Sequence, residues 1–134
     1  YLRFNFEKIK ADKRGILLRN PLNIFLSVMN RKNYINQYKD FVDQIDFWYN
    51  EFERLLKTDK TIEPIIFEKI TRDAYFLEQV LNKFNIYDVQ FIDTNKKINS
   101  NKIIKFSSFD TLPLQVQEYA KNKLEKHADI IHKI

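Results

Sequence analysis

The sequence predicts a mainly α domain, a bundle of four or five helices around a long antiparallel helix pair, with or without a small β-hairpin near residues 86–107. Three observations favour this class. The 134 residues include one Gly and three Pro, too few for a loop-rich or β-rich fold. Apolar residues make up 44% of the chain, enough for a core. Large apolar residues also repeat at helical spacing over more than twenty positions. We expect a single helical domain over residues 1–134, and the first residue, Tyr1, suggests a fragment of a longer chain.

The first quarter of the chain allows two interpretations. Residues 1–14 alternate like a strand at Leu2, Phe4 and Phe6, but they also fit a helix, which we favour, with Gly15 as its C-terminal cap. Asn20 followed by Pro21 predicts an N-cap and the first position of a second helix. The apolar phase of this helix does not continue past residues 30–33, so we expect a break there.

The long helix is predicted over residues 33–57, because its large apolar residues recur at steps of four and three. These residues are Tyr34, Tyr38, Phe41, Ile45, Trp48, Phe52 and Leu55. Such a stripe faces a core, and Trp48 is expected within it. The four-residue connection 58–61 is short enough to predict an antiparallel helix over residues 62–84, with Pro64 in its first turn.

In the last third of the chain, the spacing of the apolar residues changes. Apolar residues flank a polar stretch, 93–102, which is consistent with either a β-hairpin over 86–107 or an irregular excursion. Asp110 or Thr111 then predicts the cap of a final helix, with Pro113 in its first turn, running to the end of the chain.

Few residues offer chemistry. The chain has no Cys, no Gly-rich phosphate loop and two His, His127 and His132, whose spacing of five puts them on different faces of a helix. His127 falls on the inward stripe, so we expect a structural role for it. We therefore expect no catalytic, cofactor-binding or metal-binding residue. The sequence favours a protein without catalytic activity and leaves enzymatic function open.

One acidic run has the spacing of half of a magnesium site. Asp40, Asp43 and Asp46 are spaced three apart, but the predicted partner helix offers no matching pair of carboxylates. They also lie opposite the apolar stripe, so we expect them to face water.

The basic charge is concentrated near the start. Residues 1–33 carry eight basic and two acidic side chains, whereas the whole chain has a net charge of +5. The candidate contacts for a polyanion or a partner are Lys8, Lys10, Lys13, Arg14, Arg19 and the off-stripe aromatic Phe47.

These features favour a non-catalytic helical protein-interaction module of a larger protein or assembly, which binds a protein partner or itself. The alternative is nucleic-acid binding, or binding to an anionic membrane surface if an anchor lies upstream, through the basic segment 1–33. The absence of Cys and of glycosylation acceptor sites favours an intracellular, cytoplasmic location.

Overall fold

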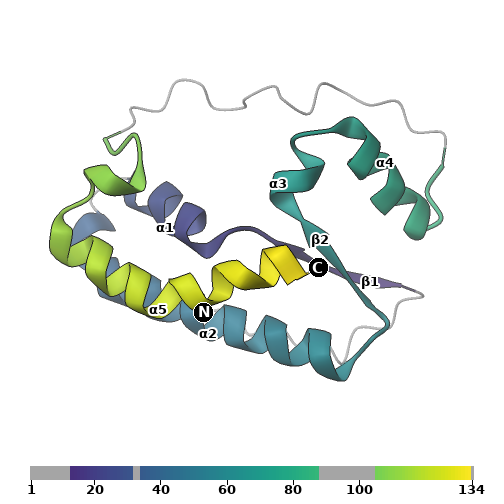
Figure 1. The fold of residues 1–134 in the computed structure, drawn as a ribbon, viewed down its shortest axis with the longest axis horizontal. Helices are drawn as coiled ribbons and strands as arrows, with labels where there is room; N and C mark the ends of the chain where they lie inside the picture. Colours follow the sequence, from purple (N-terminus) through teal and green to yellow (C-terminus); the bar gives the residue numbers. More distant parts are fainter. Residues whose placement is uncertain (1–12, 32–33, 88–104, 134) are drawn as a thin grey trace.

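The computed structural model describes residues 13–31, 34–87 and 105–133, which form a mainly α fold with a small two-stranded sheet (Figure 1). The elements, in chain order, are β1 (Arg14–Leu18), α1 (Pro21–Met29), the 3₁₀ turn η2 (Tyr34–Gln37), α2 (Tyr38–Thr58), β2 (Ile62–Ile66), α3 (Phe67–Ile70), α4 (Ala74–Lys83), the 3₁₀ turn η3 (Phe109–Thr111) and α5 (Leu114–Lys133). The predicted mainly α class is confirmed, and the small β element is a parallel pair of strands, β1 and β2, at a different place from the hairpin predicted near residues 86–107.

The two long helices, α2 and α5, lie side by side in Figure 1 and run in the same direction. Asp43, early in α2, contacts Tyr119, early in α5, whereas the later Asp46 contacts the later Lys126. The predicted antiparallel pair of helices 33–57 and 62–84 is therefore wrong. The long helix is correct, but its partner is the final helix, and the pair is parallel.

The segment after α2 explains this correction. Residues 62–66 form β2, which pairs in parallel with β1 in the register Arg14↔Ile62 to Leu18↔Ile66. Three of the five residues of β2 are β-branched Ile, which favours extended backbone. A helical region resumes only as α3 and α4, and Asp73 caps α4 by accepting a hydrogen bond from the Tyr75 N–H at 2.9 Å.

Gly15 lies inside β1, so its predicted role as a helix cap is wrong. Its φ is not positive, which a left-handed cap would require. A Cβ at this position would lie 2.9 Å from both Ile65 Cδ1 and Phe84 Cζ. Glycine therefore leaves room for the ends of the Ile65 and Phe84 side chains, which a Cβ would displace. The helix predicted over residues 1–14 lies outside the described residues except at positions 13 and 14.

The start of α1 matches its prediction. The Asn20 side chain accepts a hydrogen bond from the Leu22 N–H at 3.0 Å, and Pro21 occupies the first helical position. The helix ends at Asn30, as expected for a break beginning there. The Asn30 side chain also exchanges two hydrogen bonds with the Phe106 backbone, at 2.8 and 3.0 Å, which tie the segment before α5 to the end of α1.

The core lies between the sheet, α1 and the α2–α5 pair. Its buried members are Ile16, Leu18, Phe25, Met29, Val42, Ile45, Tyr49, Ile62, Ile66, Leu112, Val116, Ala120 and Leu124. Trp48, which was predicted to belong to this core, is instead partly exposed at its edge, with its ring centroid 6.0 Å from that of Phe52. The broad apolar face of α2 is thus buried mainly through its Val42–Ile45–Tyr49 row.

The last helix is confirmed as α5, but its predicted start is wrong. Asp110 and Thr111 belong to η3 and do not cap the helix. Pro113 immediately precedes α5, and its carbonyl accepts hydrogen bonds from the Val116 and Gln117 N–H groups at 3.0 Å. Most of the hairpin predicted near residues 86–107 lies outside the described residues, and its described ends, 86–87 and 105–107, are not strands. Among the described helices, none is both long and apolar enough to cross a membrane.

Candidate functional site

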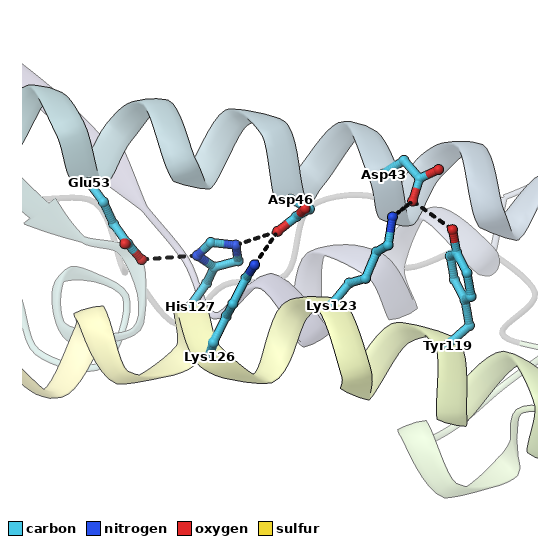
Figure 2. A network of polar contacts seen from close by, with 7 residues as sticks. All are labelled: Asp43, Asp46, Glu53, Tyr119, Lys123, Lys126 and His127. Carbon is cyan, nitrogen blue, oxygen red and sulfur yellow. Dashed lines mark hydrogen bonds and ion pairs between the residues drawn. The ribbon is translucent and has the colours of Figure 1, made fainter.

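A buried histidine joins the two long helices. His127 of α5 is only 1% exposed, and both of its ring nitrogens face carboxylates of α2. Its Nε2 lies 2.7 Å from Asp46 Oδ1, and its Nδ1 lies 2.9 Å from Glu53 Oε1. Figure 2 shows the ring between these two acids, which are seven residues apart and therefore on one side of the helix.

Further contacts extend the network along the same helix pair (Figure 2). The Asp43 carboxylate accepts hydrogen bonds from the Tyr119 hydroxyl at 2.8 Å and from Lys123 Nζ at 2.6 Å. Lys126 Nζ lies 3.2 Å from Asp46 Oδ1. The expectation that Asp43 and Asp46 face only water is therefore wrong, because α5 supplies polar partners for both.

Two opposing effects determine the pKa of the Asp46 carboxyl group. Burial by itself raises the pKa of its carboxyl, but the hydrogen bonds and positive charges of His127 and Lys126 outweigh that effect, and the pKa is lowered below 3.8. The carboxylate therefore stays ionised at neutral pH.

The pKa of Asp43, which lies at a more exposed position, is also lowered. The hydrogen bond from Lys123, followed by that from Tyr119, lowers the pKa of Asp43. The same contacts raise the pKa of Lys123 and of Tyr119, because each donates to the Asp43 carboxylate. All three groups are held in the forms that make these bonds.

The network holds helices together and does not form a metal centre. Within residues 13–31, 34–87 and 105–133, no group of three or more His, Asp or Glu side chains is arranged to hold a metal ion. His127 is closed to solvent, and each of its nitrogens already has a partner. What this arrangement shows is a row of polar contacts that join α5 to the acids of α2.

A second polar cluster lies where the parallel strands end. The buried Tyr49 hydroxyl accepts a hydrogen bond from the Arg19 N–H at 3.0 Å and donates one to the Arg19 carbonyl. The Asn20 N–H donates to Glu68 Oε1 at 2.7 Å, while Glu68 Oε2 is buried without a hydrogen-bond partner among the described residues. The Arg19 guanidinium lies over the Phe67 ring, 4.8 Å from its centroid.

An exposed apolar surface lies at α4. The helix contains no buried residue, and Tyr75 and Phe76 are 59% and 41% exposed. Ile86 and Tyr87, just beyond its other end, are 45% and 61% exposed. We name these four residues the α4 surface. The helix is attached to the sheet by an ion pair between Lys83 and Glu63, 2.8 Å long, and by the Phe84 ring over β1.

Among the described residues, the structure separates the predicted polyanion contact Arg19 from Lys13 and Arg14. Lys8 and Lys10 lie outside the described residues. Lys13 and Arg14 lie at the start of β1, where Lys13 is over the Phe84 ring and Arg14 pairs with Asp59 at 2.9 Å. Arg19 follows the other end of the strand, about 17 Å away at 3.3 Å per residue.

The remaining predicted contact, Phe47, is 43% exposed and packs edge-on against Trp48, on α2 rather than beside the α4 surface. Sequence reasoning missed both the α4 surface and the acidic partners of His127. The seven-residue spacing of Asp46 and Glu53 was a usable signal, but it required knowing that the helix bearing His127 packs on that side.

Comparison with known proteins finds no match for this chain among protein-family models, curated proteins or solved structures. Its function is therefore inferred from the geometry described above.

Proposed function

We propose that the chain is a non-catalytic interaction module that binds a protein partner through the α4 surface. The observation that supports this proposal is the exposure of four large apolar side chains around a helix that has no buried residue. Exposed aromatic residues gathered in one region of a surface are typical of protein contact sites, and aromatic residues are enriched among those that dominate binding energy.

The way α4 is attached also supports an interaction. Its described contacts with the rest of the fold are mainly those with α3, the Lys83–Glu63 ion pair and the Phe84 ring. Tyr75 and Phe76 pack on each other, with ring centroids 6.1 Å apart. A partner that covers these rings would bury apolar area already arranged for contact.

The test uses the absence of Cys from the chain, which allows one thiol to be placed at will. Gln79→Cys places it on exposed α4, and Glu125→Cys places a matched control on exposed α5. Each protein carries a thiol-linked photo-crosslinker, and the mass of the products is measured from about 5 to 200 µM, a range in which weak association is detectable.

We expect crosslinked homodimers, or a defined heteromeric product in extract, from position 79 and not from position 125. Adding Tyr75→Lys and Phe76→Lys should abolish the product, because charges would replace the apolar contact. Equal crosslinking from both positions, or a product unaffected by these substitutions, would contradict the proposal.

Arg19 supports a second candidate, the binding of a phosphate-bearing ligand. Its guanidinium forms no ion pair with a carboxylate among the described residues. The first turn of α1 has no acidic side chain of its own, and the Glu68 carboxylate accepts a hydrogen bond from the Asn20 N–H beside it at 2.7 Å. Arg19 stands where β1 ends and α1 begins, beside the end of the parallel strand β2. Helix N-termini attract anions, and parallel sheets bind ligands beyond the carboxyl ends of their strands.

Of the basic residues in the predicted segment 1–33, this candidate assigns ligand binding to Arg19. Inorganic phosphate, mononucleotides, duplex DNA, single strands, RNA and anionic vesicles are titrated at about 50 and 200 mM salt, where electrostatic contacts differ in strength. We expect binding to be lost in Arg19→Ala and kept in Arg31→Ala, whose side chain is exposed at the other end of α1. Binding by none of the ligands, or equal losses in both variants, would eliminate the candidate.

A further inference from the structure

The two-stranded sheet leaves one edge of β1 without a strand partner among the described residues. Pro64 of β2 lies opposite Ile16 and has no N–H to donate. In a parallel ladder, one residue of each such pair supplies both of its backbone groups to the other strand, so here that residue is Ile16. The alternate residues Gly15 and Leu17 therefore direct their N–H and C=O groups away from β2. We name these four groups the β1 edge.

Two neighbouring contacts agree with this orientation of the strands. The Ile62 N–H, which alternation also directs away from β1, donates to the Asp59 carbonyl at 3.4 Å. Just beyond the other end of β1, the outward N–H and carbonyl of Arg19 both bond to the Tyr49 hydroxyl. The groups of the β1 edge have no comparable partner among the described residues. The edge is therefore open, and it is bounded where Tyr49 binds Arg19.

The side chains around the β1 edge indicate what it can bind. Leu17 is 58% exposed, so an added strand would cover apolar surface there. Lys13 is exposed before the strand, Arg19 follows it, and no acidic residue lies between them. The nearest acids of β2 and of the turn before it already form ion pairs, Glu63 with Lys83 and Asp59 with Arg14. The charge along the edge is positive, which favours an acidic partner.

We propose that the β1 edge binds an extended segment of a partner protein, with acidic residues at both ends of the segment. When a peptide adds a strand to an open sheet edge, backbone hydrogen bonds supply affinity and side chains supply specificity. The stretch from Lys13 to Arg19 spans about 20 Å at 3.3 Å per residue, the length of an extended heptapeptide. Since the edge has few groups, we expect a dissociation constant of about 0.1 mM. This surface is separate from the α4 surface.

Nuclear magnetic resonance of the backbone amides tests the pairing, with the capped peptide Glu-Val-Thr-Val-Thr-Val-Glu as the probe. Gly15 is the single glycine of the chain, so selective labelling identifies its amide. The Gly15 and Leu17 amides should exchange rapidly in the free protein and about tenfold more slowly at about 1 mM peptide, where about a tenth of the protein stays free. Ile16 and Leu18, which face β2, should be protected in both states.

Two results of this measurement would overturn the proposal. Protection of the Gly15 and Leu17 amides in the free protein would show that the chain itself or a second copy already occupies the edge. Unchanged exchange of both amides at about 1 mM peptide would show that the peptide does not pair with it.

Charge variants test the acidic character of the partner. A peptide with lysine in place of both glutamates should bind at least threefold more weakly at about 50 mM salt. Lys13→Glu should weaken binding of the acidic peptide at least threefold, whereas Lys121→Glu, an equal charge change at an exposed position on α5, should not. Equal affinity for both peptides, or equal losses in both variants, would contradict the assigned partner.

Backbone variants separate strand pairing from other modes of binding. Leu17→Pro removes one outward N–H at a position of the kind where sheets tolerate proline, and Leu17→Thr keeps that N–H. We expect at least a tenfold loss of affinity in the first and less than threefold in the second. If Leu17→Pro does not fold, the probe methylated at every internal amide nitrogen makes the same test and should not bind. Undiminished binding in either case would refute strand pairing.

A last control separates this site from the α4 surface. Tyr75→Lys with Phe76→Lys should leave the affinity for the acidic peptide unchanged, because these residues lie on α4 and not on β1. A tenfold loss in this double variant would place the peptide on the α4 surface and overturn the assignment to the β1 edge.

Discussion

Tyr49 shows how a single side chain connects the sheet to the long helix. Its hydroxyl satisfies both the N–H and the carbonyl of Arg19, just where β1 ends and no strand partner can reach them. Burial raises the pKa of Tyr49 to about 12, so the hydroxyl remains a donor throughout the neutral range. The position of Arg19 is therefore set by a residue thirty positions away, and not by its own strand.

Tyr49→Phe tests this connection. We expect a loss of about 1–3 kcal/mol in the free energy of unfolding, because the two Arg19 backbone groups lose their partner. Tyr75→Phe removes an exposed hydroxyl and should change it by less than about 0.5 kcal/mol. Urea unfolding at pH 7 measures both, and equal effects would contradict the assigned role of the Tyr49 hydroxyl.

Alkaline titration provides a second test of the contribution of Tyr49 to stability. Because its pKa is raised from 10.0 to about 12 in the folded protein, its contribution to stability is full below pH 10 and is lost as the pH rises toward 12. The unfolding midpoint should therefore fall over this interval. Tyr49→Phe should show a smaller fall, and an identical one would indicate that other groups cause it.

Acid titration tests the carboxylates bound by α5. The pKa of Asp46 is lowered in the folded protein, so its contribution is present above the ordinary value of 3.8 and is lost as the pH falls below it. We expect the unfolding midpoint to decrease between pH 5 and 2, and to decrease less in Asp46→Asn. Asp40 is exposed on the same helix, so the unfolding midpoint of Asp40→Asn should decrease as much as that of the unmodified protein.

At the scale of elements, the parallel pairing of α2 and α5 organises the fold. Apolar residues of α5 enter the core, while Tyr119, Lys123 and Lys126, on an adjacent stripe, meet the acids of α2. The core contacts supply most of the attraction, and the polar contacts fix which turns of the two helices face each other. α4, by comparison, rests on the sheet through few side chains.

Two leucines of α5 differ in their exposure to solvent. Leu124 is fully buried and Leu114 is 69% exposed, at the start of the helix. Leu124→Ala should cost about 2–5 kcal/mol by leaving a cavity, whereas Leu114→Ala should cost less than about 0.5 kcal/mol. Thermal and urea unfolding measure the difference, and comparable losses would show that α5 is not seated as described.

At the scale of the whole molecule, stability should be unevenly distributed. α2 and α5 carry buried residues over much of their length, but α4 carries none. Regions with few buried contacts open at lower free energy than the core. A partner that covers α4 would therefore be expected to stabilise this helix.

Native-state hydrogen exchange measures this distribution. We expect backbone amides of α4 to exchange through local opening at low free energy, while those at the centres of α2 and α5 exchange only on global unfolding. If α4 amides were protected as strongly as those of α2, the helix would be part of the core, and its proposed role in partner binding would lose its basis.

The local features that the sequence predicted correctly arise from contacts between residues close in the chain. The Asn20–Pro21 start of α1 and the long α2 depend on capping and on periodicity, which are visible within a few turns. The burial of His127 also followed from its place on the inward stripe. By itself, then, the sequence determined a mainly α fold, the start of α1 and the bulk of α2 and α5.

Only the tertiary structure decided how these pieces pair. Residues 62–66 became a strand because β1, nearly fifty positions earlier, offered a parallel partner, and the helix expected there was replaced. The sequence predicts that Asp43 and Asp46 face water, because the pattern of their own helix does not show that α5 packs beside them. Parallel strands, the parallel helix pair and the site around His127 all join residues distant in the chain, and no local pattern specifies such contacts.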